Sequence, residues 1–391
     1  MVTITTPTPK AIYVHIPFCT NKCHYCDFTA YVVKGQPVDA YLDALEREMI
    51  VTTEQLPPAQ IETIFIGGGT PTILEPEQME RLLANLKKYF PQWASTIEVT
   101  VEANPGTTGP ELLAAMYEGG VNRLSMGVQT FRPELLRAIG RIHSVDDVYR
   151  SVQQARKAGF SNLSLDLMFG LPKQTKADME HTLREAVALE PEHFSVYSLK
   201  VEEGTPFDQW QREGRLQLPH EEEELAMYQV ARSYLQAHGY PQYEVSNFAQ
   251  VGRKSEHNLV YWRNQPFYGL GAGAHGYTDG VRHSNVRTIQ GYIDASVGTH
   301  RPRADEHEVT REEAMENQLI LGLRLAEGVS KYQFERKFSC SMEDVFGEII
   351  HAWIQSGHLQ WEQEHLKLTE QGLLFGNDVF AAFLGEAIIT N

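Results

Sequence analysis

Six short apolar segments alternate with longer amphipathic segments over residues 11–249, and this alternation restricts the fold more than any other feature. The short segments are rich in β-branched residues and are often bounded by Gly or Pro, which is typical of buried parallel strands. They cover residues 11–17, 61–68, 96–104, 123–129, 162–172 and 193–201. The longer segments have helical spacing, and a sixth helix is expected over residues 220–239.

Six strand–helix units in series predict an α/β fold with a parallel sheet and right-handed crossovers. Periodicity alone does not distinguish an open doubly wound sheet from a barrel. Both architectures place ligands at the carboxyl ends of the strands, so functional residues are expected there. The chain has 391 residues, of which 42% are hydrophobic, and this is enough for at least one large core.

Beyond the strand–helix units, the composition changes twice. Residues 250–304 are rich in Gly, His and aromatic residues, and we interpret them as a connecting region after a first domain of residues 1–249. Residues 305–391 predict a helix, two shorter helices, a hairpin and a final helix, which is the layout of a small winged-helix-like α+β domain. This domain has 16 acidic and 6 basic residues, which favours a protein-facing role over DNA binding.

The formal net charge of the chain is -17, which argues against a nucleic-acid partner because phosphate binding requires a basic surface. The polar N-terminus lacks the apolar stretch of a secretory signal, and no apolar run reaches the roughly 18 to 20 residues of a membrane span. Four cysteines do not make a disulfide framework. We therefore expect a soluble, cytoplasmic protein, with peripheral membrane contact and a homodimer left open.

Three of the four cysteines, Cys19, Cys23 and Cys26, directly follow the first strand in a CxxxCxxC pattern. One interpretation is a zinc site with His15 or His24 as the fourth ligand, although structural zinc sites usually draw their ligands from two separated pairs. The other interpretation is a [4Fe–4S] cluster bound by three thiolates. Because full protein ligation of such a cluster takes four cysteines, one iron would remain open to an exogenous ligand.

The CxxxCxxC pattern after the first strand resembles that of the radical S-adenosylmethionine (SAM) superfamily, in which SAM chelates the open iron. Further motifs resemble those of the oxygen-independent coproporphyrinogen oxidases and their relatives over most of residues 11–280. These motifs are YVHIPFC, GGGTPT, VEANP, RLSMGVQTF, DLMFGLP and GAGAHGY. The resemblance implies a partial (β/α)6 barrel that carries a [4Fe–4S] cluster and SAM.

The same resemblance implies a SAM-binding role for nine residues. Tyr13 would pack beside the cluster, Tyr25 would contact the adenine, and Arg141 would pair with the SAM carboxylate, which suits a planar bidentate donor. The glycine-rich loop would hold the methionine end, and polar residues on the third, fourth and fifth strands would contact the rest of SAM. In chain order these residues are Gly68, Gly69, Thr70, Glu102, Gln129 and Asp166. Each also has a structural alternative, such as a satisfied polar group inside the barrel.

Two departures separate this chain from the oxidases that it resembles. Those oxidases carry a further cysteine two residues after the third, where this chain has Phe28, and a long segment before the first strand, where this sequence has ten residues. The segment HNLVYW, residues 257–262, instead resembles the HNxxYW signature of the HemW-type heme chaperones. In that family the histidine at the position of His257 is implicated in heme binding. Imidazole is a common axial ligand of heme iron, and Tyr261 and Trp262 offer flat apolar surface.

The structural alternative is that His257 caps a turn and that Trp262 fills a core between domains. A GxGxxG pattern at Gly271, Gly273 and Gly276 is followed by polar, turn-like residues instead of the helix of a dinucleotide site, so we do not interpret it as one. His275 and His283 in and after this segment are secondary ligand candidates.

The sequence therefore predicts a heme chaperone that binds heme and transfers it to apo-hemoproteins, with a [4Fe–4S] cluster and SAM in its barrel. The alternative is an enzyme of porphyrin biosynthesis, an oxygen-independent coproporphyrinogen III oxidase. The two differ in whether the radical SAM scaffold performs catalysis, which the residues leave open.

Overall fold

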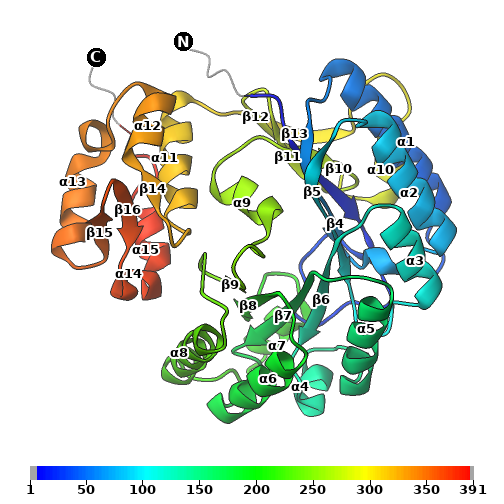
Figure 1. The fold of residues 1–391 in the computed structure, drawn as a ribbon, viewed down its shortest axis with the longest axis horizontal. Helices are drawn as coiled ribbons and strands as arrows, with labels where there is room; N and C mark the ends of the chain where they lie inside the picture. Colours follow the sequence, from blue (N-terminus) through cyan, green and yellow to red (C-terminus); the bar gives the residue numbers. More distant parts are fainter. Residues whose placement is uncertain (1–6, 388–391) are drawn as a thin grey trace.

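The computed structural model describes residues 7–387, and its largest element is an eight-stranded sheet in the order β10-β1-β4-β5-β6-β7-β8-β9 (Figure 1). Six of these strands follow one another in the sheet in the same order as in the chain, and each pairs in parallel with the next. They are β1 (Ala11–Ile16), β4 (Ile61–Gly68), β5 (Trp93–Ala103), β6 (Arg123–Gln129), β7 (Leu163–Phe169) and β8 (His193–Ser198). The predicted series of six strand–helix units is therefore confirmed.

Two short strands extend the sheet at its edges. β9 (Asn247–Ala249) pairs antiparallel with β8, and β10 (Tyr268–Leu270) pairs parallel with β1. The two edges do not pair with each other, so the barrel is incomplete. β10 comes from residues 250–304, so this region contributes to the sheet as well as connecting. The division of the chain at residues 249 and 304 stays a prediction. Residues 1–6 of the first predicted domain and residues 388–391 of the last lie outside the described residues.

Helices cover the outer face of the sheet, as Figure 1 shows for the α1 to α8 series. Buried Leu, Met and Ala side chains of α1, α2, α3, α5, α6 and α8 pack on the Ile, Val and Leu side chains of the strands and form the main core, whereas α4 and α7 contribute to a smaller separate cluster. Reciprocal capping boxes at Ser144 and Thr175 begin two of these helices, α5 and α6. The helices are α1 (Val38–Gln55), α2 (Pro76–Tyr89), α3 (Pro110–Glu118), α4 (Pro133–Ala138), α5 (Val145–Lys157), α6 (Lys176–Ala188), α7 (Pro206–Arg212) and α8 (Glu221–Ala237).

The connecting region holds more regular structure than its composition indicates. Besides β10 it contains helix α9 (Glu256–Trp262), which lies between the sheet and the C-terminal domain in Figure 1. An antiparallel three-stranded sheet follows. The elements here are β11 (His275–Thr278), β12 (Val281–Asn285), α10 (Ile289–Ala295) and β13 (Arg303–Glu308).

The C-terminal domain has its own core, in which Phe334, Phe338, Phe346 and Phe383 pack together. Its order of helix, strand, two helices and hairpin is that of a winged helix, as expected, although α13 is longer than predicted. A three-stranded antiparallel sheet joins the elements. They are α11 (Arg311–Gly322), β14 (Val329–Ser330), α12 (Lys331–Phe338), α13 (Met342–Gln355), β15 (Leu359–Glu362), β16 (His365–Leu368), α14 (Glu370–Leu374) and α15 (Gly376–Ala381).

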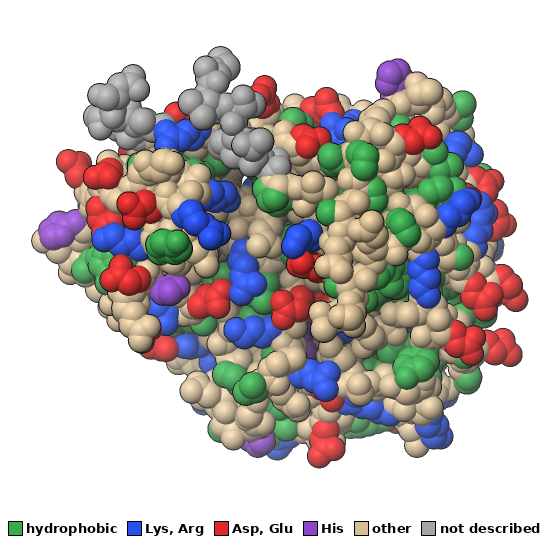
Figure 2. Space-filling view, turned by 45° about the horizontal axis from the view of Figure 1, so that its top comes forward, with side chains coloured by type: hydrophobic (Ala, Val, Ile, Leu, Met, Phe, Trp, Pro, Cys, Tyr) green, Lys and Arg blue, Asp and Glu red, His purple; other side chains and the backbone are tan. Residues whose placement is uncertain are grey.

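Trp262 at the end of α9 packs between the two domains. It joins a small cluster with Tyr243 and Leu325, and the guanidinium of Arg324 lies 5.2 Å from its ring centroid. The structural interpretation of Trp262 is therefore confirmed. Acidic and basic side chains are interspersed over the face of the molecule drawn in Figure 2. Within residues 7–387, no helix is long and apolar enough to cross a membrane.

A buried carboxylate fastens the connecting region to the barrel. Glu48 on α1 accepts hydrogen bonds from the backbone N–H of Gly271 (2.7 Å), from Asn285 Nδ2 (2.6 Å) and from the hydroxyl of Tyr292. Burial raises the pKa of Glu48 to about 7, although these three donors favour the ionised form. All three of these donors are thus paired with the carboxylate, and the ionised form of Glu48 is buried as a result.

We expect Glu48→Gln to change how stability depends on pH. The folded pKa lies above the ordinary value of 4.5, so this group makes the unmodified protein less stable as pH rises from about 4.5 to 7. Glutamine does not titrate, so the stability advantage of the unmodified protein over Glu48→Gln should be largest below about pH 4.5. It should shrink by roughly 3 kcal/mol by pH 8, as urea unfolding at a series of pH values can measure.

Glu54→Gln is the matched control, because Glu54 lies on the same helix and is exposed. A stability difference between Glu48→Gln and the unmodified protein that stays constant or grows between pH 5 and pH 8 would show that Glu48 does not carry this pH dependence.

Candidate cluster and cofactor site

The cysteine loop leaves the carboxyl end of β1 and is fixed by neighbouring loops. Cys19 ends the short strand β2 (Phe18–Cys19), which pairs with β3 (Tyr31–Val32), and all three cysteines are free and half-buried. Between them, Asn21 Nδ2 donates to the carbonyl of Gly140 (2.9 Å), and the backbone N–H of His24 donates to the carbonyl of Ile139 (3.1 Å). These two hydrogen bonds tie the cysteine loop to the loop that follows α4.

Both histidines proposed as zinc ligands are already engaged. His15 Nδ1 pairs with the hydroxyl of Tyr13 (2.8 Å) and its Nε2 with the carbonyl of Thr29 (2.7 Å). The ring of His24 packs edge-on against Trp210, with centroids 4.8 Å apart, and its Nδ1 faces the carbonyl of Ala138. Among residues 7–387, no three His, Cys, Asp or Glu side chains are close enough together to hold one metal ion. A cluster places its thiolates on different irons, so the sulfurs lie farther apart than around a single ion.

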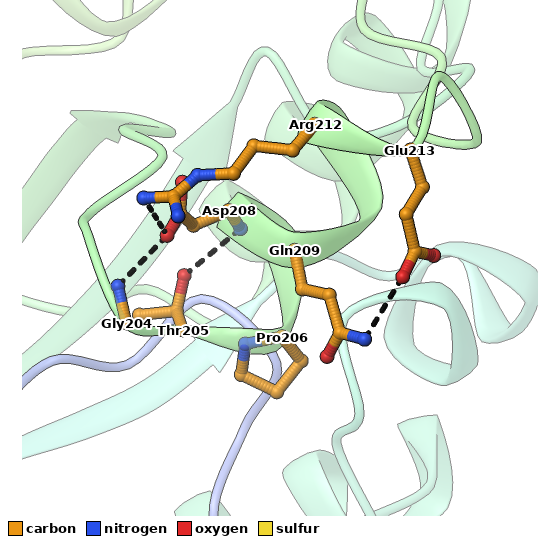
Figure 3. Close-up of a pocket in the computed structure, with 7 residues that line it drawn as sticks. All are labelled: Gly204, Thr205, Pro206, Asp208, Gln209, Arg212 and Glu213. Atoms are coloured by element: carbon orange, nitrogen blue, oxygen red, sulfur yellow. Dashed lines mark hydrogen bonds and ion pairs between the residues drawn. The ribbon is translucent and has the colours of Figure 1, made fainter.

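Helix α7 supports the cysteine loop from outside. The N–H of Phe207 donates to the carbonyl of His24 (3.1 Å), and the rings of Phe207 and Trp210 pack against the His24 ring. Figure 3 shows a surface depression at this helix, but its polar groups pair with one another: Asp208 accepts from Gly204 and Arg212, and Gln209 donates to Glu213. We therefore assign α7 a supporting role.

The glycine run, of which Gly67 and Gly68 end β4 and Gly69 follows it, is closely packed at each position. Gly68 has φ +110°, and a Cβ there would lie 2.4 Å from the His15 ring. A Cβ on Gly69 would lie 2.5 Å from the carbonyl oxygen of Phe18, and one on Gly67 would lie 2.7 Å from Glu102 Oε2. Three consecutive glycines thus have a structural explanation that the sequence did not reveal. They bring the backbone of this loop against the cysteine loop.

A chain of hydrogen bonds joins four of the predicted site residues. Arg141 Nη2 donates to the hydroxyl of Tyr25 (3.1 Å), and Arg141 Nη1 donates to Asn104 Oδ1 (2.6 Å). Asn104 Nδ2 donates to Thr70 Oγ1 (2.7 Å), and the Thr70 hydroxyl donates to Cys19 Sγ (3.6 Å). Asn104 was not among the predicted residues, although its place directly after a strand in VEANP was an available signal.

The other polar residues of the site lie on the inner side of the strands. Glu102 accepts from the backbone N–H of Gly68 (2.9 Å), and Asp166 accepts from Ser125 Oγ (3.1 Å). Gln129 has φ 66°, which is strained for a non-glycine residue, and it lies where the register between β6 and β7 shifts. Gln129 Nε2 and Arg141 Nη2 both lie 3.0 Å from a Cβ placed on Gly127, so these two side chains converge.

Burial controls the charge states of the site. It raises the pKa of Glu102 to about 7 and also raises the pKa of Asp166, and each carboxyl group faces the charge of Arg123 and Arg141. Burial likewise raises the pKa of Cys19 and brings that of Cys26 to about 11. Metal binding to these thiols would therefore release protons. Arg141 Nε is buried and has no hydrogen-bond partner in residues 7–387, which fits an anionic ligand group.

His257 lies apart from the cysteines, in the polar interior of the barrel. Its side chain is 0% exposed, its Nδ1 pairs with Thr63 Oγ1 (2.9 Å) and its Nε2 pairs with the hydroxyl of Tyr261 (2.8 Å). Phe65 stacks on its ring with centroids 5.3 Å apart, and Tyr13 stacks on Phe65 with centroids 6.3 Å apart. Burial lowers the pKa of His257 to about 3, so the imidazole is neutral. Of the two secondary candidates, His275 is exposed and His283 is buried.

Known proteins match this chain in both domains. The Radical SAM superfamily matches residues 13–186, and the HemN C-terminal domain family matches residues 309–375. The heme chaperone HemW of Bacillus subtilis (strain 168) is 48% identical over 377 residues, which cover 96% of this chain and 100% of that protein. HemW of Escherichia coli (strain K12) is 34% identical over 384 residues, which cover 97% and 99%.

Among solved structures, the coproporphyrinogen III oxidase (HemN) from Escherichia coli superposes with a TM-score of 0.83 at 24% identity, covering 96% of this chain and 90% of that chain. This likeness confirms the α/β radical SAM fold with a small C-terminal α+β domain. The fold and the superfamily match thus define a radical SAM protein. The full-length identities go further: the chain belongs to the HemW heme chaperone family.

Gly69→Ala should destabilise the fold by about 2 to 3 kcal/mol, because its Cβ would collide with the backbone of the cysteine loop. Gly347→Ala is the matched control: it lies in helix α13 with no atom within 4 Å of the added Cβ, so it should be neutral or slightly stabilising. Urea unfolding measures both. Equal stability of the two variants would contradict the close approach of these loops.

Proposed function

We propose that this protein binds heme and delivers it to apo-hemoproteins, and that its barrel carries a [4Fe–4S] cluster on Cys19, Cys23 and Cys26 with SAM at the fourth iron. The relatives at 48% and 34% identity, both heme chaperones, support the first part. The hydrogen-bond chain from Arg141 to Cys19 carries the second, because it connects the predicted carboxylate partner of SAM to a predicted cluster ligand.

The donor set fits the cofactors. Three thiols on one short loop suit a cluster that leaves one iron open, and the bound cluster would supply an electron to SAM. Arg141 would pair with the SAM carboxylate through its unpartnered Nε and its terminal nitrogens. Tyr13, Tyr25, Gly68, Gly69, Thr70, Glu102, Gln129 and Asp166 complete the proposed SAM site. Six of these residues are partly exposed, whereas Thr70 and Gln129 are buried.

Heme ligation by His257 requires a rearrangement, because both ring nitrogens are engaged and the side chain is buried. Helix α9, which carries this histidine, has only seven residues, and Glu98 holds its start by accepting from the N–H groups of Glu256 and His257. We propose that heme displaces the hydroxyl of Tyr261 from His257 Nε2. The neutral imidazole is then the form that binds iron.

Anaerobic reconstitution should load about four irons and four sulfides per chain. Cys19→Ala, Cys23→Ala and Cys26→Ala should each lower the iron content to well below one per chain. Cys340→Ala is the matched control, because Cys340 lies in the C-terminal domain beside Met315 and Arg311. Iron and sulfide analysis with absorption spectra measures the result. Tight binding of a single zinc ion without iron would contradict the cluster.

Heme titration followed by the Soret band tests the histidine. His257→Ala should weaken heme binding at least tenfold. Tyr261→Phe should tighten it roughly fivefold, because it removes a competing hydrogen bond worth about 1 kcal/mol. His275→Ala should leave the affinity unchanged. Loss of binding in His275→Ala with full binding in His257→Ala would reassign the ligand to the exposed histidine.

The cluster-loaded protein should not convert coproporphyrinogen III when SAM and a reductant are supplied. Phe28, which is 63% exposed, occupies the position of the further cysteine in the oxidases that the sequence resembles. Stoichiometric formation of protoporphyrinogen would overturn the chaperone proposal in favour of an oxidase.

A further inference from the structure

The hydrogen-bond chain from Arg141 to Cys19 has only one possible direction. A guanidinium can donate but not accept, so the atom of Asn104 at 2.6 Å from Arg141 must be its oxygen. The amide nitrogen of Asn104 therefore points to Thr70 and donates to Oγ1 at 2.7 Å. Because this lone pair of Thr70 is taken, its hydroxyl proton is free to point at Cys19 Sγ, 3.6 Å away.

The surroundings hold this direction in place. Thr70 is 1% exposed, and its backbone N–H donates to the carbonyl of Phe18 (2.7 Å), which fixes the hydroxyl next to the cysteine loop. Arg141 is fixed at the far end by Tyr25 and by convergence with Gln129 around Gly127. Chains of hydrogen bonds that begin at a cation polarise one another in a low-dielectric interior.

We propose that Thr70 and Asn104 form a relay that couples SAM binding at Arg141 to the electron affinity of the cluster through Cys19. This inference rests on the proposed function. Hydrogen bonds to cluster sulfurs stabilise the reduced, more negative state and raise the reduction potential. A carboxylate on Arg141 would partly neutralise the guanidinium and so weaken each donor along the relay. Thr70 and Asn104 are positioning residues in this scheme.

The test measures the midpoint potential of the reconstituted cluster with and without SAM. Thr70→Val removes the donor while keeping the shape, so the potential should become more negative. This decrease should be larger without SAM than with SAM, because SAM already weakens the same hydrogen bond. Thr70→Ser keeps the hydroxyl donor, so it should have the midpoint potentials of the unmodified protein. Asn104→Leu, like Thr70→Val, should make the change in potential on SAM binding smaller.

Thr100→Val is the matched control, because its hydroxyl is fully buried on β5 and has no partner in residues 7–387. It should change neither potential. Linkage adds a second readout: the ratio of SAM dissociation constants for reduced and oxidised protein should change by about two- to threefold in Thr70→Val and not in Thr100→Val.

Unchanged potentials in Thr70→Val, with the cluster loaded and the fold intact by urea unfolding, would overturn the relay while the proposed function stands. A shift of equal size with and without SAM would overturn the coupling. Failure of the unmodified protein to form any [4Fe–4S] cluster would instead overturn the proposed function, and the relay with it.

Discussion

The parallel pairing of six consecutive strands is the constraint on which the site depends. Because each strand returns in the same direction, the loops after β1, β4, β5 and β6 all leave from one edge of the sheet. Cys19, Thr70, Asn104 and Arg141 come from these four loops. They are spread over more than a hundred residues of sequence, yet they lie within hydrogen-bonding distance of one another. The strand topology thus brings these residues together, and packing of the cysteine loop on Gly69 and Gly140 fixes the position of that loop.

The interior of the barrel is polar, and this separates it from barrels that are filled by apolar side chains. Glu102 and Asp166 face the interior together with Arg123 and Arg141, so each buried carboxyl group has a nearby cation. Arg123 is 1% exposed, and its buried Nε has no hydrogen-bond partner among the described residues. Burying such groups costs several kcal/mol unless partners or water compensate. A barrel built to hold polar ligands accepts this cost, whereas a barrel built for stability alone does not require it.

The strands were predicted well from the sequence because short segments rich in β-branched residues indicate strands and no other element. For example, β6 (Arg123–Gln129) matches the expected range. The rule for strand ends predicted where the cysteines lie, whereas Arg141 and Thr70 were predicted from the family resemblance. Sequence reasoning missed Asn104, because a single amide after a strand looks like a turn residue until its two partners are known. It also missed the packing reason for three glycines and the strand formed by Tyr268–Leu270, since both depend on contacts between segments distant in sequence.

His257 shows how the closed structure bears on the proposed heme chemistry. Freeing Nε2 costs the hydrogen bond to Tyr261, about 1 kcal/mol, and moving the ring out of its position would also cost the hydrogen bond to Thr63 and the stacking on Phe65. An opening free energy of about 3 kcal/mol would leave roughly one molecule in a hundred competent for ligation, and the apparent heme affinity would fall by the same factor. For a storage protein this would be a disadvantage. For a protein that passes heme on, a histidine that regains internal partners when heme departs makes release easier, so the buried arrangement agrees with transfer.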